Sequence, residues 1–539
     1  MELTWSLMAD MDGDETYETD LTGYVEKPGS GITIQRGIGR DGKPLSSRMN
    51  VALSNRGGEF TPGNTASPFY GQMRTGTPVR LTVTHASGSY TRWTGYILSW
   101  RTSWAVGQVS MAPVVCGDLF ELLRDAETVN VTASTSRDTD GALVEILTAM
   151  GLDSGDYDLD DGVQDLPMHF CVGEEPLAAM MAVAASEMGG MLYPDVLGRV
   201  RFEARNSRLG TNPVAIWGDG TEVVPVSVEY DLNPNEFCTS VTARGTVFHE
   251  GQADTLLWED TRNMLTNPAS SLEIAPGEVY ERVYQTASAY VALTALEQTK
   301  DFLANSAADG SGTDETASLS LTLTELGGGY IRLRRENTSG STIYNTRMRV
   351  RGQPVEFYAD RPAAMFSLAV TGRPVGKSLQ FDVPFAGDEK LRDYAYQELM
   401  VGRYPWPVLR LTFMASSAAE IAALLAADLG QLIYYADNDL PAEQRAYVDD
   451  WWYIEAISDA IPPDWAGQAF RTTVTLVPSY VYRDLDAIVF DTFDRDDASG
   501  DLGTSFSGDV WADDTGFDIS GGYAVPNDAG LQVPSMAVA

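Results

Sequence analysis

The chain has 539 residues, enough for about three to five domains, and its 44% hydrophobic content can fill ordinary cores, which argues against general disorder. Its 76 acidic residues against 37 basic ones give a formal net charge of −39, and a surface of that sign repels phosphate, which excludes sequence-specific duplex binding through basic contacts. Three cysteines and three histidines, scattered along the chain, are too few for a disulfide framework or a zinc site.

The N-terminus, MELTWSLMADMDGDE, has neither the basic segment nor the apolar core of an export signal. The most apolar stretch, 418–435, is interrupted by Glu420, Asp428 and Gln431, so no membrane span is expected. These features predict a soluble protein that is synthesised in a cytoplasm.

Residues 1–128 predict a first β domain. Period-two patterns bounded by turn residues predict strands at 32–36, 49–54, 79–84, 90–100 and 109–115. A short helix at 117–123 follows them.

Residues 129–225 shift toward helix and predict an α+β domain. Asp140 is expected to cap a helix whose apolar side includes Leu143 and Leu147. A second helix, 176–188, starts with Pro176 and ends at a Gly-Gly pair. Strands at 191–195 and 200–202, joined by a turn at Gly198, complete this domain.

Residues 226–380 return to strands, at 226–230, 239–244, 318–323, 330–335 and 343–352, and predict a second β-rich, barrel-like region. Residues 381–483 predict a second α+β domain. Its helix, 388–401, carries apolar residues on one face, and strands are expected at 408–413, 451–457 and 471–477. The apolar residues on that helix face are Leu391, Tyr394, Ala395 and Leu399. The composition changes again at 484–539, a C-terminal β extension.

The stretch 51–83 predicts two strands joined by a long structured loop. VALSN and VRLTV alternate apolar with polar residues, and the segment between them is rich in Gly, Pro and Asn, which favour turns. Phe60, Phe69 and Tyr70 give this loop apolar anchors. A loop of this length within a domain is typically functional or part of an interface.

The same stretch carries a family resemblance. Asn-Arg-x-Gly-x-Phe-x-Pro-x-Asn (55–64), Ser-Pro-Phe-Tyr-Gly (67–71) and Gly-x-Pro-Val-Arg (76–80) resemble the N-terminal barrel of minor tail proteins from siphophages of actinobacteria. Those proteins are similar to the baseplate hub proteins at the tail tip of tailed phages. The helix–Gly–strand–turn–strand unit at 176–202 and the strand pair around Asn-Thr-Ser-Gly (337–340) resemble the same family, and 493–524 resembles the opening of a lectin-like module.

The resemblance implies a mixed α+β, mostly β fold with two tail-tube-like β-barrel modules, 1–128 and 226–380. The intervening α+β domains would be 129–225 and 381–483, and 484–539 would begin a lectin-like β module or form a tether. It further implies a structural virion protein and not an enzyme: a tail-tip hub that joins the hexameric tail tube to a three-fold tip and forms part of the DNA ejection channel.

The implied partners are two further copies in a homotrimer, the distal tail or tail tube protein, the tape measure protein and other tail-tip or receptor-binding proteins. Phage DNA would pass without specific binding, and a host cell-surface glycan is a further possible ligand. The chain would be synthesised in the host cytoplasm and reside in the tail tip of the virion.

Two interpretations of the acidity stay open: solubility, including a salt-rich habitat, or a negatively lined passage along which DNA slides. The alternative function is a receptor- or glycan-binding tail adhesin, or a glycan-cleaving tail enzyme. Trp451, Trp452 and Trp511 are candidate sugar-stacking residues, although core packing is the favoured interpretation.

Three motifs resemble ligand sites but depart from them, so we predict no catalytic, cofactor or metal residues and no cofactor. Residues 37–42 match GxGxxG but precede a strand, not the helix that a dinucleotide site needs. Residues 372–378 are one residue short of a P-loop and contain Pro374. Residues 156–167 half-match a calcium loop but end in Pro167 in place of Glu. Glycan-binding residues stay undefined.

Overall fold

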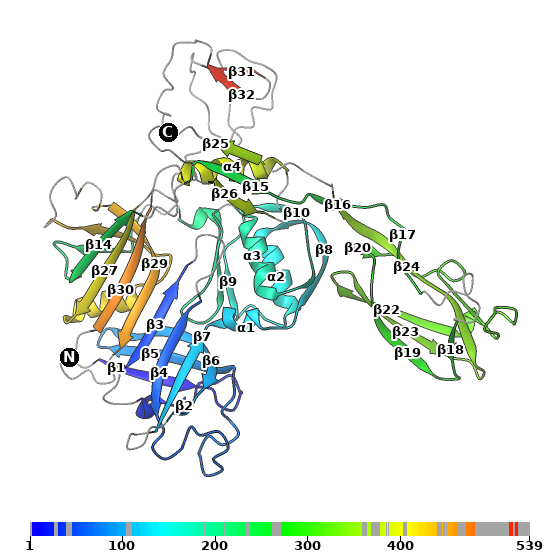
Figure 1. Cartoon of the computed structure of the whole chain (residues 1–539), viewed down its shortest axis with the longest axis horizontal. Helices are drawn as coiled ribbons and strands as arrows, with labels where there is room; N and C mark the ends of the chain where they lie inside the picture. Colours follow the sequence, from blue (N-terminus) through cyan, green and yellow to red (C-terminus); the bar gives the residue numbers. More distant parts are fainter. Residues whose placement is uncertain are drawn as a thin grey trace.

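A computed structural model gives the fold of the chain (Figure 1). It describes residues 3–25, 31–38, 46–103, 110–187, 189–208, 212–232, 238–260, 271–357, 364–367, 378–383, 385, 388–402, 407–438, 445, 448, 450–461, 470–479, 517–520 and 523–526. The protein is mostly β with few helices, as predicted. None of the described helices is both long and apolar enough to cross a membrane.

The N-terminal module is a run of antiparallel strands followed by a short helix. Buried and partly exposed residues alternate along its strands, as in β5, so the sheet has one buried apolar face and one more exposed face. Its elements are β1 (Thr4–Ala9), β2 (Thr19–Asp20), η1 (Thr22–Tyr24), β3 (Ile32–Gly37), β4 (Arg48–Ser54), β5 (Thr77–His85), β6 (Gly88–Trp100), β7 (Met111–Gly117) and α1 (Leu119–Arg124).

A second module, from the other end of the chain, continues the same sheet. Strand β29 pairs antiparallel with β3 from Ala456↔Gly37 to Ile461↔Ile32, so the 13-stranded sheet runs β14-β27-β30-β29-β3-β4-β7-β6-β5-β1-β2, with β13 and β28 branching from β29. This module consists of β13 (Ala215–Gly218), β14 (Ser227–Leu232), β27 (Pro407–Ala415), α5 (Ala418–Ala426), β28 (Leu432–Ala436), β29 (Asp450–Ile461) and β30 (Phe470–Pro478). We call the two modules together the joined sheet.

One hydrophobic core lies under the joined sheet. Leu53, Leu81 and Trp93 from the N-terminal module belong to the same buried cluster as Phe413 and Trp452 from the second module. The two modules therefore fold around shared apolar contacts and are not separate domains. Among the described residues the strand order stays open from β14 to β2, and no pairing closes it into a barrel.

An α+β body follows α1 and has a core of its own. Its helices α2 (Thr139–Ala149) and α3 (Pro176–Ala185) pack on two small sheets, and α3 has Pro176 in its first turn as predicted. The helix α2 begins before Asp140, which lies in its first turn and accepts a hydrogen bond from Gly162 N, so the expectation that Asp140 is the cap is wrong. The strands are β8 (Val129–Asp138), β9 (Tyr157–Leu159), β10 (Asp165–Glu174), β11 (Met191–Pro194) and β12 (Val200–Glu203), with η2 (Arg205–Arg208) after them.

A buried carboxylate, Asp118, lies at the junction between the N-terminal module and this body. Asp118, 1% exposed, caps α1 by accepting a hydrogen bond from Glu121 N, and it also accepts one from Ser47 N at 2.5 Å. Burial outweighs these hydrogen bonds and raises the pKa of Asp118 from 3.8 to about 6.

We expect the stability that Asp118 contributes to depend on pH. Because the folded-state pKa is raised, the contribution is fully present below about pH 4 and is lost as the pH rises through about 6. The free energy of unfolding of the wild type relative to Asp118→Asn should fall by about 2–3 kcal/mol between pH 4 and pH 7. Urea unfolding of both proteins at several pH values measures this difference, and parallel stability curves would contradict it.

A small sheet packs on one helix above this body. In it, β15 (Ser240–Arg244) pairs with β25 (Ala364–Ser367) and β26 (Ser378–Asp382). The helix α4 (Asp388–Gly402) covers this sheet with the apolar face predicted from the sequence, Leu391, Tyr394, Ala395 and Leu399. In the C-terminal extension, β31 (Phe517–Ser520) and β32 (Tyr523–Pro526) form a hairpin, and a lectin-like module is not established by this hairpin alone.

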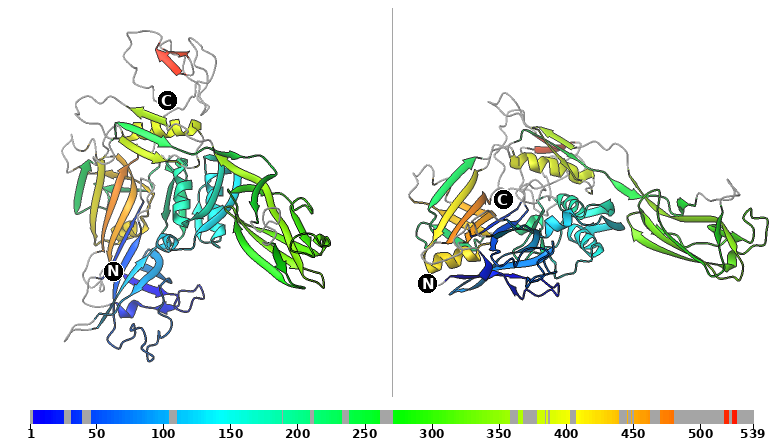
Figure 2. Two further views of the ribbon diagram at one scale, coloured as in Figure 1. Left: turned by 45° about the vertical axis from the view of Figure 1, so that its right-hand side comes forward. Right: turned by 60° about the horizontal axis from the view of Figure 1, so that its bottom comes forward.

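The strands between β15 and β25 form a separate β domain that projects from the rest of the chain in both views of Figure 2. The long strand β24 (Ile343–Phe357) organises one sheet, and β23 (Tyr330–Asn337) lies between β19 and β22 in another. The remaining strands are β16 (Phe248–Glu250), β17 (Thr255–Glu259), β18 (Leu272–Ile274), β19 (Val279–Gln285), β20 (Tyr290–Leu293), β21 (Phe302–Asn305) and β22 (Leu319–Gly327), with η4 (Thr316–Ser318) before β22. We call residues 248–357 the projecting domain.

The region 226–380, expected to form one barrel-like unit, is thus divided among three sheet systems in the described residues. Its first strand, β14, belongs to the joined sheet, β15, β25 and β26 form the small sheet under α4, and β16 to β24 form the projecting domain. The partner of the N-terminal module in the joined sheet comes mainly from 407–478.

A triple-glycine turn attaches the projecting domain to the α+β body. Gly327, Gly328 and Gly329 all have positive φ, and Gly328 N donates a hydrogen bond to Val131 O at 3.1 Å. A Cβ atom on Gly328 would overlap the carbonyl oxygen of Cys171.

We therefore expect Gly328→Ala to loosen the projecting domain, by about 1–3 kcal/mol of local stability, because both the backbone conformation and the contact would be strained. Faster hydrogen exchange in β8 and β10 measures the loss. Gly340→Ala is the matched control, since a Cβ atom there meets nothing within 4 Å. Equal exchange in the two variants would show that this turn does not hold the domain.

Candidate functional site

The long loop between β4 and β5 is a regular series of turns. Backbone hydrogen bonds link every third residue: Gly58 N to Asn55 O, Thr61 N to Gly58 O, Asn64 N to Thr61 O, Ser67 N to Asn64 O, and Tyr70 N to Ser67 O, at 3.0–3.2 Å. Repeated turns of this kind give the loop a fixed shape without helix or strand. We call residues 55–76 the turn loop.

The polar residues of the sequence motif hold the turn loop together. Asn55 accepts a hydrogen bond from Phe60 N at 2.8 Å and donates to Thr61 Oγ1 at 2.9 Å. Asn64 Nδ2 donates to Gly58 O at 2.8 Å, and Ser67 Oγ donates to Glu59 O. The motif that carries the family resemblance therefore encodes this conformation, because its side chains replace the missing secondary-structure bonds.

An aromatic cluster fixes the turn loop to the N-terminal module. Phe60 is fully buried, with its ring centroid 5.2 Å from Phe69, 5.9 Å from Trp100 and 5.0 Å from Tyr24. Tyr70, by contrast, is 53% exposed at the end of the series. The loop thus presents an aromatic side chain to solvent from a rigid base, an arrangement typical of an interface.

A buried arginine connects the two modules of the joined sheet. Arg92 on β6 donates from Nε and Nη2 to Asp459 Oδ2 on β29, at 3.0 and 2.8 Å, and both residues are 1% exposed. Its Nη1 donates to the carbonyl oxygens of Leu425 and Ala427 at the end of α5, at 2.8 and 3.1 Å. The positive charge meets the negative end of the helix as well as the carboxylate.

Further polar contacts link the second module to the N-terminal module and to the α+β body. Arg36 on β3 pairs with Asp428, just after α5, at 2.5 Å. On the side of the α+β body, Arg208 pairs with Glu203 at 2.7 Å and accepts, through its carbonyl oxygen, a hydrogen bond from Tyr453 of β29. None of these residues stood out in the sequence, because an isolated Arg or Asp has no periodic signal.

The outward side of the joined sheet, which we call the open face, carries uncharged polar and small apolar side chains, three arginines and two acidic residues. The register of the strands defines its members, which lie on the side opposite the shared core in the seven adjacent strands β14, β27, β30, β29, β3, β4 and β7. Its members are Thr33, Gln35, Arg48, Asn50, Ala52, Ser54, Met111, Pro113, Val115, Ser227, Glu229, Asp231, Val408, Arg410, Thr412, Met414, Ala456, Ser458, Ala460, Arg471, Thr473 and Thr475.

The charged residues of the open face are two acids on β14 and one arginine on each of β27, β30 and β4. Glu229 and Asp231 both belong to the edge strand β14, and Glu229 lies 3.9 Å from Arg410. Arg48 pairs with Glu121 at 2.9 Å. The other positions carry uncharged side chains, and Thr412 and Thr473 are hydrogen-bonded to each other at 3.1 Å. The interpretation of the net charge as a negatively lined surface does not apply to this face.

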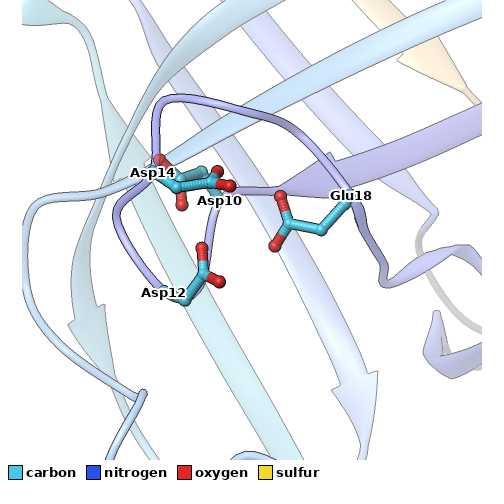
Figure 3. Close-up of side chains that lie close together, drawn as sticks. All are labelled: Asp10, Asp12, Asp14 and Glu18. Carbon is cyan, nitrogen blue, oxygen red and sulfur yellow. The ribbon is translucent and has the colours of Figure 1, made fainter.

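An acidic loop follows β1 (Figure 3). One carboxylate oxygen from each of Asp10, Asp12, Asp14 and Glu18 lies within 4.8 Å of the others. Desolvation, followed by the charge of Asp14, raises the pKa of Asp12. Asp10 accepts hydrogen bonds from Gly13 N and Glu15 N, at 2.6 and 3.0 Å, so the loop is already held by its own backbone. Carboxylates in this arrangement suit a hard cation, but nothing else here points to one.

The motifs that we set aside have structural roles where the structure describes them. Asp158 pairs with Arg199 at 2.9 Å and Asp160 with Arg201 at 2.6 Å, so the calcium-loop half-match is an ion-paired surface segment. Gly37 ends β3, which pairs antiparallel with the next described element, β4, and residues 39–42 of this motif lie outside the described residues. Trp452 is fully buried. Trp511 and most of 372–378 lie outside the described residues.

Comparisons with known proteins found similar solved structures but no matching family. No protein-family model and no curated protein matches the chain. Among solved structures, it is similar to the 43 kDa tail protein of prophage MuSo2 from Shewanella oneidensis, at 11% identity over 89% of this chain and 99% of that one, with a TM-score of 0.45. A tail protein from Neisseria meningitidis MC58 matches at 9% identity over 89% and 98%, with a TM-score of 0.46. An E. coli component of the type VI secretion system matches at 8% identity over 89% and 77%, with a TM-score of 0.35. At this level of similarity we infer nothing about assembly or activity from them.

Proposed function

We propose that the chain is a structural subunit of a phage-type tail: a tail-tip hub that joins a six-fold tube to a three-fold tip and forms part of the channel through which DNA leaves. One observation carries the proposal. Each chain contributes two strand modules that share a single sheet and a single core, through β3 and β29. Such a pair is a rigid unit, because separating the modules would expose buried apolar surface and break the Arg92–Asp459 pair.

The two modules per chain match the symmetry of such a junction. Three copies arranged around an axis present six modules, so a trimer can face a hexameric ring on one side and a three-fold assembly on the other. The second module in this proposal is 407–478 with β14, and not 226–380.

The turn loop supplies a surface for a neighbouring subunit or tube protein in this assembly. Its motif is the part of the chain that resembles minor tail proteins, its shape is fixed by hydrogen bonds, and Tyr70 is exposed on it. The distal tail or tube protein and the tape measure protein are the partners we propose for the assembled hub, which would reside in the virion. The role is structural and not enzymatic.

Native mass spectrometry and electron microscopy of the purified full-length chain test this function. We expect a species of three times the chain mass and a ring with three-fold symmetry and a central opening. A chain that stays monomeric at tens of micromolar and forms no ring with a hexameric tube protein would overturn the proposal.

A further inference from the structure

Aromatic side chains gather at one edge of the projecting domain. Trp258 and Tyr284 lie on β17 and β19, the end strands of two different sheets, with ring centroids 4.3 Å apart and an interplanar angle of 39°. Tyr280 and Arg282 lie on the same side of β19 as Tyr284, and the Arg282 guanidinium carbon is 5.5 Å from the centroid of the Tyr280 ring. Arg282 is exposed, and the three aromatic side chains are partly exposed. We call these four residues the aromatic edge.

A buried arginine holds the rings of the aromatic edge in place. Arg335 on β23 is 0% exposed, and its guanidinium carbon lies 5.8–5.9 Å from the centroids of all three rings. Its Nη1 donates hydrogen bonds to Asp260 Oδ2 at 2.8 Å and to Asn345 Oδ1 at 3.0 Å. Its Nη2 donates to the Tyr284 hydroxyl at 3.4 Å. Because the rings are already fixed, they lose little conformational entropy when a ligand covers them, so the aromatic edge is pre-organised for binding.

The aromatic edge combines apolar surface with hydrogen-bond donors. The exposed part of each ring is apolar, whereas Arg282, which forms no ion pair with any residue that the structure describes, carries N–H groups that can donate. A saccharide has a matching combination, because one face of a pyranose ring exposes C–H groups and its rim carries hydroxyl groups. An aliphatic protein side chain would cover the rings but would leave the Arg282 donors without acceptors, which costs free energy for each unpaired group. This composition therefore favours a saccharide.

The charge of the chain selects among saccharides. A net charge of −39 opposes the approach of a polyanionic saccharide, whereas an uncharged one meets no such repulsion. The two acids that follow Trp258 in the sequence are already paired, Glu259 with Arg349 at 2.9 Å and Asp260 with Arg335 at 2.8 Å. The aromatic edge is therefore locally balanced in charge and suits a neutral ligand.

We propose that the aromatic edge binds a neutral saccharide, which packs on the exposed surface of its three rings and accepts hydrogen bonds from Arg282. This inference goes beyond the proposed function and does not depend on it. The projecting domain extends away from the joined sheet in both views of Figure 2, so a ligand bound here leaves the surfaces of the joined sheet uncovered.

Binding of the labelled full-length chain to a glycan array tests this proposal. The array carries neutral and acidic oligosaccharides of bacterial surfaces, and titration of the neutral ligand that binds best gives its dissociation constant. We expect the chain to be retained on neutral saccharides. Packing and hydrogen bonds to an uncharged ligand are not screened by salt, so the dissociation constant should change less than about twofold between low salt and about 0.5 M NaCl.

Two substitutions in the aromatic edge have matched controls elsewhere in the projecting domain. Tyr280→Ala and Arg282→Gln should each weaken saccharide binding at least about fivefold, because one removes packing surface and the other removes hydrogen-bond donors. Tyr344→Ala on β24 and Arg332→Gln on β23 remove the same groups at positions that alternate with buried residues and so face away from the core of the domain. Both controls should bind within about twofold of the wild type.

Each outcome decides the inference. Weaker binding by both variants of the aromatic edge, with unchanged controls and unchanged thermal unfolding, supports it. If Tyr280→Ala unfolds the projecting domain, Arg282→Gln decides alone, because the side chain of Arg282 is exposed. Retention of no neutral saccharide, retention of acidic saccharides only, or equal binding by variants and controls overturns the inference. Native mass spectrometry of the same samples reports the oligomer separately, so the hub function stands or fails independently of the saccharide result.

Discussion

Arg92→Met should destabilise the joined sheet by about 3–5 kcal/mol, the largest effect that we expect from a single ion pair in this chain. The substitution keeps much of the side-chain volume but leaves the Asp459 carboxylate, 1% exposed, without its two charged hydrogen bonds. It also leaves the carbonyl oxygens at the end of α5 without a donor. Urea unfolding followed by tryptophan fluorescence measures the loss, since Trp93 and Trp452 lie in the shared core.

Two controls identify the cause. Arg137→Met removes an exposed ion pair with Glu145 at 2.9 Å and should cost less than about 1 kcal/mol. Adding Asp459→Asn to Arg92→Met should recover part of the lost stability, because the buried charge is then removed. If Arg92→Met and Arg137→Met are equally stable, the buried pair does not hold the two modules together.

Phe60→Ala should unfold the turn loop while the rest of the chain stays folded. Phe60 is fully buried and its ring contacts Phe69, Trp100 and Tyr24, so truncation leaves a cavity that costs about 3–5 kcal/mol. Phe60 is the more deeply buried of the two phenylalanines that anchor this loop, so we expect the loss to exceed the local stability of the loop. Limited proteolysis measures this: we expect cleavage within 55–76 to become at least tenfold faster.

Tyr70→Ala is the matched control for the turn loop. Tyr70 is 53% exposed, so its truncation should leave the cleavage rate within about twofold of the wild type. If the loop contacts a neighbouring subunit, as we propose, Tyr70→Ala should weaken assembly without unfolding. Slow cleavage of Phe60→Ala would mean that the polar hydrogen bonds alone keep the loop in place.

Local pattern predicted many elements of this fold. The apolar face of α4 could be read from Leu391, Tyr394, Ala395 and Leu399 because a helix repeats every 3.6 residues whatever it packs against. The unit of α3, β11 and β12 followed from Pro176 and Gly198, whose backbone preferences act within a few residues. The turn loop was predicted as structured for the same reason.

The sheet partners could not be predicted from such patterns. The pairing of β3 with β29 joins residues more than four hundred positions apart. The alternation of apolar and polar residues along a strand shows that one face of the strand is buried, but not which element covers that face. The grouping of 226–380 as one unit failed to anticipate the division of its strands for this reason. The helix α5 is absent from the predicted elements, although Ser417 and Glu420 form a capping signal.

The open face was also beyond local analysis. Net charge is a sum over the chain, and only the pairing of the strands from β14 to β7 shows which charged residues share this face. The contacts of Arg92, Asp459 and Ser458 could not be predicted, because their neighbours lie on strands that are distant in the sequence.

The projecting domain begins and ends at the same point. Phe248 and Phe357 are register partners in adjacent antiparallel strands, so the chain leaves and re-enters through positions about 5 Å apart. We expect that a segment with that geometry can be deleted and its two ends joined by a tight turn. It could equally be replaced by a different insert, and in both cases the backbone on either side should keep its path. Changes of length or chemistry in the part of the domain that lies away from the triple-glycine turn should therefore leave the scaffold unaltered, and it is here that we expect relatives of this chain to vary most in size.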